Sequence, residues 1–393
     1  MDQLLNTPIT DFFQWAKLRT PVWPDNNVPD MHVEKYTDFK LCEPKKRIGI
    51  EVEVEGIGRM SGAIDKYIWM TKADGSLRNN GCEFVTLPIA GRQVIYAVDN
   101  LFTNLPPTAD FSERTSIHIH VNVREQTIGQ ILTLLMLYTV FEQLLFEFAG
   151  PQRKKNIFCV AIQETRYPYM IMNFLKNQSF IDLIMSWKKY SGLNLGIMRG
   201  LGTIEYRIME GHSDPLRLLK WINILLRMHQ YVRVVSFKQA YEEIRTLNTS
   251  SMYEQFVRNV FKSDADDLLK NVYNLQQLLE VGVSSAKTFG LPSEFLTSLT
   301  SKVSTDSLLL KQLEVKEYPP VAKKSESLFS EDMLAKYVAN FRYTARAATA
   351  AEMQQATQGA YITNPAHQVG QMPPQDVGMT LDDLYRDEPV EWR

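Results

Sequence analysis

Three short segments of the chain alternate strictly between apolar and polar residues. A repeat of two is the period of a β-strand, in which successive side chains point to opposite faces. The pattern predicts strands at 48–55, 116–123 and 203–208. Their polar positions are Glu51, Glu53, Glu55, Ser116, His118, His120, Asn122, Thr203, Glu205 and Arg207. A solvated face more often carries Thr, Lys, Ser and Gln, so this set indicates a functional site on one sheet face.

Shorter patterns predict the other elements of the first 245 residues. The expected strands are 69–71 and 83–87, and the expected helices are 91–100, 128–148 and 216–244. Gly150-Pro151 should end the second helix, because Gly followed by Pro is a common helix stop. Asp214 and Pro215 should begin the third, since Asp caps a helix and Pro suits its first turn.

The two ends of the chain differ in character from this middle part, residues 47–245. Residues 1–46 are expected to form an irregular N-terminal extension with one short amphipathic piece at 11–18. No strand pattern follows residue 245. The expected features are a helical region at 246–315 with helices at 252–287 and 293–312, then a linker from 316, a helix at 330–355 and a tail to 393. The tail is rich in Gln, Pro, Gly, Asn and Met, which favours disorder.

Composition narrows the class of protein. With 393 residues, 45% of them hydrophobic, the chain can bury a large core. A net charge of −2 gives no general attraction to nucleic acid or to a membrane surface. Three cysteines without metal-type spacing suit a reducing cytoplasm.

The start of the chain does not resemble a signal peptide. The apolar run at 128–141 is shorter than the about 20 residues that span a bilayer. We therefore expect a cytoplasmic protein without a membrane partner.

The spacing of the carboxylates suits metal ions. Two carboxylates at positions i and i+2 of a strand lie about 7 Å apart on one face, too far to share a proton. Mg²⁺ needs only one or two protein carboxylates, and a histidine among the ligands makes Mn²⁺ acceptable. Arg207, beside Glu205, offers a planar fork for phosphate or carboxylate. Two cations with such an arginine are typical of phosphoryl transfer.

The order of the motifs resembles a known family. The motifs are Glu-x-Glu at 51–53, Asp-Gly-Ser-Leu at 74–77, Gly-x-Glu-Phe-Val-Thr-x-Pro at 81–88, His-x-His-Val-Asn at 118–122 and Thr-Ile-Glu-Tyr-Arg at 203–207. In this order they resemble the amidoligase family of phages and bacteria. That family belongs to the carboxylate–amine ligases related to glutamine synthetase and glutamate–cysteine ligase. The similarity covers roughly residues 47–235.

The resemblance implies a fold and a reaction. The implied fold is α+β, a curved antiparallel sheet of glutamine-synthetase type flanked by helices. Its concave face is expected to bind ATP and two or more divalent cations, Mg²⁺ or Mn²⁺. In the implied reaction ATP phosphorylates a carboxylate, and an amine displaces the phosphate to form an amide or isopeptide bond. The expected partners are amine and carboxylate substrates, either small molecules or peptides. The sequence leaves open a homo-oligomer and a partner for the C-terminal tail.

The resemblance also assigns roles to individual residues. The metal ligands that it implies are Glu51, Glu53, Glu83, His118 and Glu205. Arg207 matches the arginine that contacts the transferring phosphoryl group, and His120 and Asn122 would lie beside the substrate or nucleotide. Arg199 and Lys189 match cationic groups for the acceptor carboxylate. The expected catalytic residues are Arg207, Glu53 and His120, and the expected cofactor-binding residues are Arg207, Asn122, Arg199 and Lys189.

Several alternatives stay open at this level. Glu55 has no counterpart in the family, and a solvated strand end is expected for it. The candidates for the base that takes the amine proton are Glu55, His120 and Asp74, although Asp74 before Gly75 also suits a turn. Two other functions compete with the ligase. One is a phosphotransferase of the guanidino-kinase kind on the same scaffold, and the other is a non-catalytic binding or structural protein.

Overall fold

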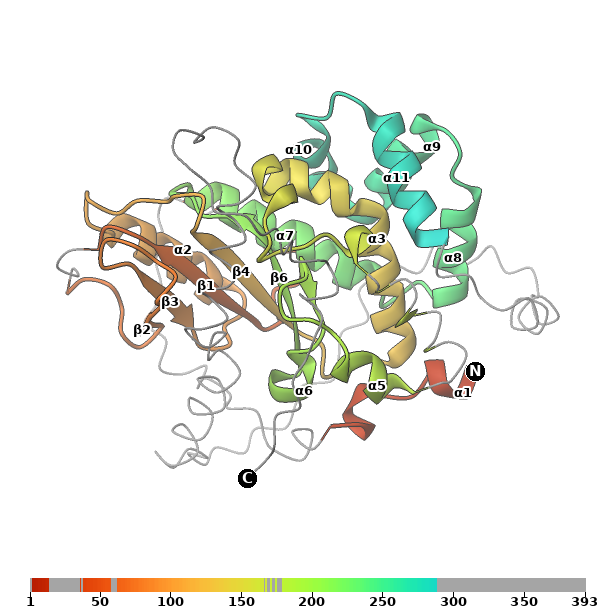
Figure 1. Ribbon diagram of the computed structural model, residues 1–393, viewed down its shortest axis with the longest axis horizontal. Coiled ribbons are helices and arrows are strands. Elements are labelled where there is room, and N and C mark those ends of the chain that lie inside the picture. The colour runs from red at the N-terminus through yellow and green to blue at the C-terminus, as the bar shows by residue number, and fades with distance from the viewer. Residues whose placement is uncertain are drawn as a thin grey trace, which may run out of the picture.

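A six-stranded antiparallel sheet forms the centre of the protein (Figure 1). It is seen in a computed structural model that describes residues 2–13, 36, 38–57, 62–165, 167, 170–171, 174 and 179–287. The strands are β1 (Ile48–Val54), β2 (Trp69–Ala73), β3 (Cys82–Thr86), β4 (Ser116–Asn122), β5 (Leu193–Asn194) and β6 (Thr203–Glu210). Their order across the sheet is β2-β3-β1-β4-β6-β5. The predicted antiparallel sheet is confirmed; β5, only two residues long, was not predicted.

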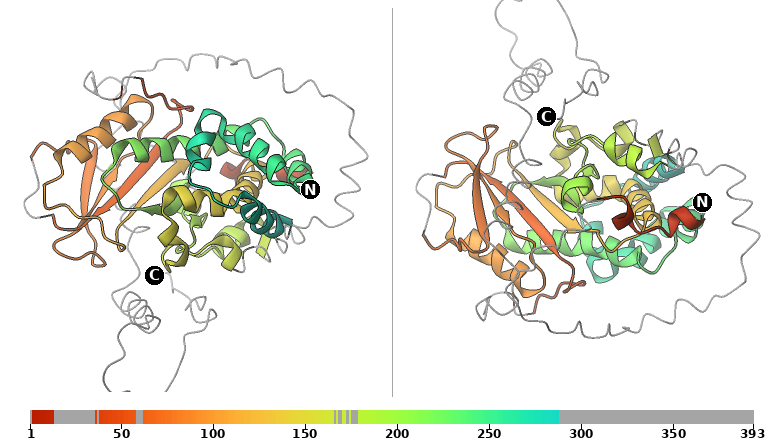
Figure 2. Two further views of the ribbon diagram at one scale, coloured as in Figure 1. Left: turned by 90° about the horizontal axis from the view of Figure 1, so that it is seen from above. Right: turned by 90° about the horizontal axis from the view of Figure 1, so that it is seen from below.

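Helices flank this sheet, as expected for an α+β fold. They are α1 (Asp2–Leu5), α2 (Arg92–Asn104), α3 (Ile128–Ala149), α5 (Phe180–Met185), α6 (Met198–Leu201), α7 (Pro215–Tyr231), α8 (Phe237–Thr246), α9 (Ser250–Phe261), α10 (Ala265–Leu269) and α11 (Leu275–Lys287). Short 3₁₀ turns lie at Ile9–Asp11, Pro151–Lys155, Ile162–Glu164 and Lys262–Asp264. Figure 2 shows α2 and α7 lying along one face of the sheet.

The apolar positions of the alternating strands form the core. Those on β1, β4 and β6 are buried: Ile48, Ile50, Val52, Val54, Ile117, Ile119, Val121, Ile204, Tyr206 and Ile208. Tyr206 also meets a polar partner, because its hydroxyl lies 2.9 Å from Nε2 of His229 on α7. Because these side chains are buried on one face of the sheet, the alternate residues of the same strands point to the opposite face. The strand period therefore separates the core from the face that carries the charged residues.

Helix α3 runs through the middle of the helical part. Thr127 and Gln130 form a capping box at its start, and it ends at Gly150, as predicted. Among the described residues, α3 is the one helix long and apolar enough to cross a membrane by length and composition. Most of it is buried inside the molecule, where it contacts α7, α8, α10 and α11. This environment is that of a core helix.

The single helix predicted at 216–244 is wrong. Helix α7 ends at Tyr231 and α8 begins at Phe237. Ser236 caps the second helix with a reciprocal bond to Gln239, which gives the chain a local alternative to helix continuation. The break lets α8 pack against α3. The predicted start of α7 is confirmed, because the Asp214 carboxylate accepts bonds from the N–H groups of Leu216 and Arg217.

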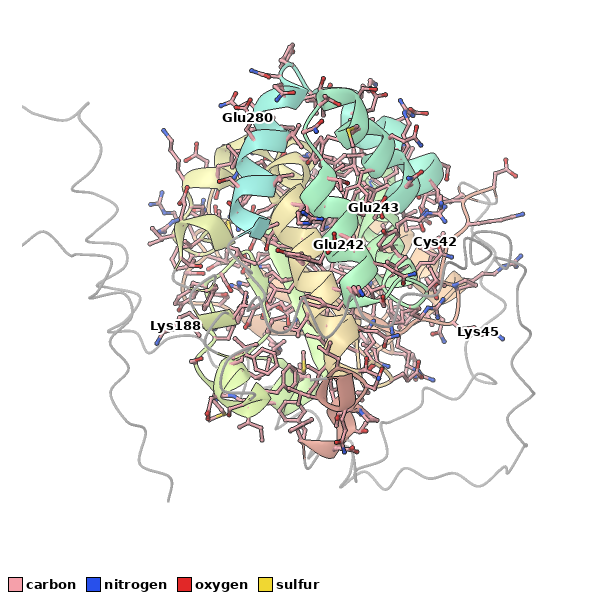
Figure 3. The ribbon with its side chains drawn as sticks, turned by 90° about the vertical axis from the view of Figure 1, so that its right-hand side faces the viewer. Cys42, Lys45, Lys188, Glu242, Glu243 and Glu280 are labelled. Atoms are coloured by element: carbon pink, nitrogen blue, oxygen red, sulfur yellow. The ribbon has the colours of Figure 1, made fainter. Side chains whose placement is uncertain are left out.

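The helical region predicted at 252–287 is present as α9, α10 and α11. Figure 3 shows Glu280 on α11 and Glu242 and Glu243 on α8, at the helical side of the molecule. The helices expected at 293–312 and 330–355, the linker and the tail lie outside the described residues. The same is true of residues 14–18 in the short amphipathic piece expected at 11–18.

Candidate active site

The strand register brings the polar positions of four neighbouring strands together. Glu51 on β1 lies opposite His118 on β4, and His120 lies opposite Glu205 on β6. On the other side of β1, Glu53 lies opposite Glu83 on β3. Directly opposed residues of antiparallel strands have side chains in contact range. The site is therefore assembled across β3, β1, β4 and β6.

Glu51, His118 and Glu205 form the centre of this face. One potential ligand atom from each of them lies within 4.8 Å of the others. Nδ1 of His118 is 3.2 Å from a Glu51 oxygen and 3.5 Å from a Glu205 oxygen. All three side chains are buried, so the two carboxylates need a positive partner between them. Two carboxylates and one imidazole are a donor set that fits Mg²⁺ or Mn²⁺.

Arg207 extends the centre along β6. Its Nη1 pairs with the Glu205 carboxylate, its Nε donates to the carbonyl oxygen of Phe158 at 3.3 Å, and Nη1 lies 3.5 Å from Nδ1 of His118. Burial opposes its charge, but the carboxylates of Glu205, Glu53 and Glu51 together outweigh this effect and raise the pKa of the guanidinium. Arg207 is therefore a fixed cation beside the candidate metal ligands.

A β-bulge shapes β6 at this point. Ile117 pairs with Met209, whereas Ile119 pairs with Tyr206. Between these pairs β4 has one residue and β6 has two, so the regular ladder is interrupted opposite His118. Bulges re-aim side chains, and this one lies where Arg207 meets the acidic centre.

Glu83 and Glu53 form the β3 side of the cluster. Burial, and then the negative charge of Glu51, raise the pKa of Glu83 well above its usual range. Lys72 Nζ lies 3.7 Å from the Glu83 carboxylate and offsets part of this effect. The crowded carboxylates thus favour the protonated form of Glu83. A divalent cation at this position would replace the proton and neutralise the crowded carboxylates.

His120 joins the acidic centre to a neighbouring pocket. Its Nε2 is 3.1 Å from a Glu51 oxygen, and its Nδ1 is 3.2 Å from the Thr203 hydroxyl. Burial lowers the pKa of His120, but the charge of Glu51, its hydrogen bond and the charge of Glu205 together outweigh burial and raise the pKa. Glu51 therefore makes the His120 imidazole a stronger base.

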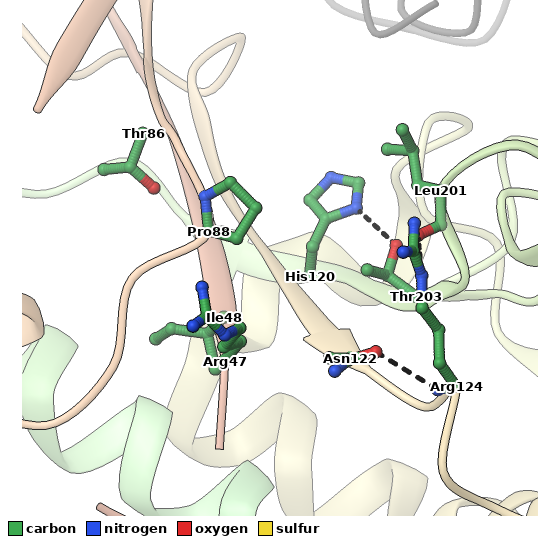
Figure 4. A pocket seen from close by; sticks show the side chains of 10 residues that line it. Arg47, Ile48, Thr86, Pro88, His120, Asn122, Arg124, Leu201 and Thr203 are labelled. Carbon is green, nitrogen blue, oxygen red and sulfur yellow. Dashed lines mark hydrogen bonds between the residues drawn. The ribbon is translucent and has the colours of Figure 1, made fainter. Parts of the chain in front are cut away.

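The pocket lies at the end of β1 and β4 (Figure 4). It encloses about 440 Å³ of empty space, solvent included. Its lining consists of Arg47, Ile48, Gly49, Thr86, Pro88, His120, Asn122, Arg124, Leu201 and Thr203. Arg124 donates through Nη2 to the Leu201 carbonyl at 2.9 Å, and its backbone N–H donates to the Asn122 side chain. The pocket thus combines apolar walls with two guanidinium groups next to the acidic centre.

The remaining predicted residues lie at different distances from this centre. Asn122 lines the pocket. Lys189 is partly buried, and burial followed by the charge of Arg207 lowers its pKa. The carboxylates of Glu205, Glu51 and Glu83 act on this pKa in the opposite direction. Arg199 is exposed on α6, where Nη1 lies 3.6 Å from the Met185 sulfur. The structure does not bring Arg199 into the cluster.

The expectation of a solvated Glu55 is wrong. Glu55 is only 2% exposed, and its carboxylate accepts the backbone N–H of Arg78 at 2.7 Å. Its backbone also pairs with Asp110 in both directions, which continues the sheet beyond β1.

Asp74 has the turn role that was expected as an alternative, because its carboxylate accepts bonds from the backbone and hydroxyl of Ser76.

Two polar residues of the site received no role from the sequence. Ser116 bonds both Glu53 and His118. Its position two residues before His118 on the same face was a usable signal. Asn194 on β5 donates to the second Glu205 oxygen at 2.7 Å. Because β5 has two residues, no periodicity in the sequence reveals that Asn194 belongs to the sheet.

Comparison with known proteins identifies the class to which this fold and site belong. The model of the family described as "putative amidoligase enzyme" matches residues 31–229, just over half of the chain. The protein therefore belongs to the amidoligase family and is a ligase-type enzyme. A solved structure described as a novel glutamine synthase homolog is similar over 71% of this chain and 72% of its own, with 13% identity and a TM-score of 0.30. No curated protein matches the chain.

Proposed function

We propose that the protein is an ATP-dependent carboxylate–amine ligase that forms an amide or isopeptide bond through an acyl phosphate. The observation that carries the proposal is the buried group of Glu51, His118 and Glu205 with Arg207 beside it on the same sheet face. Membership of the amidoligase family supports the same class of reaction. The substrates are a carboxylate and an amine, on small molecules or peptides, in the cytoplasm.

The acidic face is proposed to hold two divalent cations. Glu51, His118 and Glu205 would hold one of them, and the cross-strand pair of Glu53 and Glu83 would hold the other. Bound cations of this kind neutralise phosphate oxygens and keep the transferring phosphoryl group in line. Mg²⁺ is the expected ion, with Mn²⁺ as a substitute.

The pocket beside His120 is proposed to take the nucleotide. Ile48, Pro88 and Leu201 offer apolar contacts for a base, while Arg47 and Arg124 offer positive charge for polar groups of the nucleotide. Because His120 belongs both to the pocket and to the acidic centre, a nucleotide in the pocket would have its phosphates at the proposed cations.

The residues then divide the reaction between them. A free carboxylate is a poor electrophile, because its charge repels an amine and oxide is a poor leaving group. A carboxylate oxygen attacks the γ-phosphorus and ADP leaves, while Arg207 stabilises the charge on the moving phosphoryl group. Lys189 would bind the acceptor carboxylate. The neutral amine next attacks the acyl carbon, phosphate leaves, and the amine proton passes to His120.

The proposal is tested by product analysis. The protein is incubated with ATP and Mg²⁺ over a panel of amino acids and polyamines, and the products are identified by mass spectrometry. Equal amounts of ADP, phosphate and a condensed product are expected. ADP with a phosphorylated acceptor and no condensation would favour the phosphotransferase, and absence of nucleotide binding in calorimetry would favour the non-catalytic protein.

One substitution tests the site itself. Glu53→Gln removes a charge from the second proposed cation site and keeps the side-chain volume, so ATP turnover should be lost while circular dichroism is unchanged. Glu280→Gln, on the exposed side of α11, is the matched control and should turn over ATP like the wild type. Wild-type turnover by Glu53→Gln would contradict the assignment.

A further inference from the structure

We propose that Ser116 is a positioning residue that aims two metal ligands, Glu53 and His118, toward their cations. The inference rests on the proposed metal centre but goes beyond it, because Ser116 itself binds no metal. Ser116 is the first residue of β4 and is 4% exposed. It lies on the same strand face as His118, two residues earlier in the chain.

Ser116 holds one oxygen of Glu53 by two hydrogen bonds. Its backbone N–H donates to Oε2 at 2.8 Å, and its hydroxyl donates to the same atom at 2.7 Å. These bonds fix the plane of the carboxylate and engage Oε2. Oε1 is then the oxygen of Glu53 that remains for a cation. Hydrogen-bonded carboxylates of this kind are oriented before the metal binds.

The hydrogen bonds of Ser116 also show that Nε2 of His118 carries a proton. The Ser116 hydroxyl has one hydrogen, and Glu53 takes it because an ionised carboxylate can only accept. The same hydroxyl oxygen lies 2.8 Å from Nε2 of His118. This contact is a hydrogen bond only if Nε2 donates. The count of donors and acceptors around the Ser116 hydroxyl therefore requires a proton on Nε2 of His118.

The proton on Nε2 has a consequence at the other nitrogen. Once Nε2 donates to Ser116, Nδ1 is the nitrogen left to face the acidic centre, where it donates to Glu51 while it carries hydrogen and presents a lone pair to a cation that replaces that hydrogen. Nδ1 is the atom that lies 3.2 Å from Glu51 and 3.5 Å from Glu205, within the candidate metal group. A chain of bonds from the Glu53 carboxylate through the Ser116 hydroxyl thus sets both the tautomer and the ring orientation that a cation at Nδ1 requires.

Metal binding without nucleotide tests the role of Ser116. Mn²⁺ is titrated into the wild type, Ser116→Ala and Ser116→Thr, and free Mn²⁺ is followed by electron paramagnetic resonance. Ser116→Ala should weaken binding about 10- to 100-fold, as loss of such an outer partner generally does. Ser116→Thr keeps the hydroxyl and should bind close to wild type. Ser213→Ala, an exposed serine before α7, is the control for a loss of hydroxyl elsewhere.

A second measurement separates positioning from packing. In protein loaded with diamagnetic Mg²⁺, ¹⁵N–¹H spectra of the histidine rings should show a slowly exchanging Nε2 proton on His118. The signal is assigned by its absence in His118→Asn. In Ser116→Ala this proton should exchange faster, because its acceptor is gone. Ser116→Thr changes the packing at the same position but keeps the hydroxyl acceptor, so it should keep the slow exchange.

The outcomes distinguish this inference from the proposed function. Equal Mn²⁺ affinity in the wild type and Ser116→Ala, or a proton on Nδ1 of His118 in the Mg²⁺-loaded protein, overturns the role of Ser116. A wild type that binds no Mn²⁺ overturns it together with the metal centre. A protein that shows the expected Ser116 effects but forms no amide overturns the ligase and leaves Ser116 as a positioning residue of a metal site.

Discussion

At the scale of single residues, the site is a balance of buried charges. Glu51 lies between His118 and His120, and Glu205 lies between Asn194 and Arg207. Burial raises the pKa of Glu51, but the charge of His120 and the bonds from both histidines outweigh it and hold that pKa well below its usual range. A buried carboxylate is stable only with such partners.

Arg207→Lys tests whether the shape of the cation matters as well as its charge. Lysine keeps the charge but loses the planar fork, so it cannot hold Glu205 and a phosphoryl group together. Turnover should fall about 10²–10³-fold, as for the loss of one donor to a transition state. Arg245→Lys, an exposed arginine of α8, is the control. The assignment fails if steady-state ADP formation by Arg207→Lys equals that of the wild type.

At the scale of elements, close approaches fix how the helices pack on the ligase core. Helix α11 crosses α3 at Gly282. A Cβ atom there would lie 2.1 Å from the carbonyl oxygen of Val140 and 2.9 Å from its carbon. Both atoms belong to the backbone of a buried helix, so neither can move easily. The glycine is needed because two helix backbones meet there.

Gly282→Ala should destabilise the protein, although replacing Gly by Ala usually stabilises a helix. In an open helix the change stabilises by about 1 kcal/mol. Here the methyl group must displace α11 from α3, so we expect the free energy of unfolding in urea to fall by about 1–3 kcal/mol. Ser284→Ala on the exposed side of the same helix should not destabilise. A more stable Gly282→Ala protein would show that α11 does not pack as described.

At the scale of the whole molecule, the proposed cations join strands that are far apart in sequence. Glu51, His118 and Glu205 come from β1, β4 and β6, and Glu83 adds β3. No such arrangement exists in the unfolded chain, so a cation that binds it binds the folded state alone. Binding free energy then becomes folding free energy.

Mn²⁺ should therefore raise the thermal midpoint. At 100 times the dissociation constant the gain is about 2.7 kcal/mol, which corresponds to about 5–10 °C for a domain of this size. A chelator should reverse the shift, as measured by calorimetry. Glu205→Gln should abolish the shift, whereas Glu280→Gln should keep it. An equal shift in Glu205→Gln would indicate that the ion binds elsewhere.

The sequence by itself determined the parts of this protein that depend on local periodicity. The period of two located β1, β4 and β6 and assigned Glu51, His118 and Glu205 to one face, because alternation follows from strand geometry alone. Local helix signals likewise located both ends of α3. The order of the motifs indicated the family, although each motif alone is weak.

Only the tertiary structure decided which of these residues meet. Whether Glu53 faces Glu83 depends on the register between strands, and the position of Arg207 depends on a bulge opposite His118. The burial of Glu55 depends on the distant segment at Asp110 that pairs with it. The exposure of Arg199 and the bond from Asn194 to Glu205 depend on how the short elements α6 and β5 sit against the sheet. Local pattern sets the direction of a side chain within its own strand. Its partners come from long-range pairing, which no local pattern encodes.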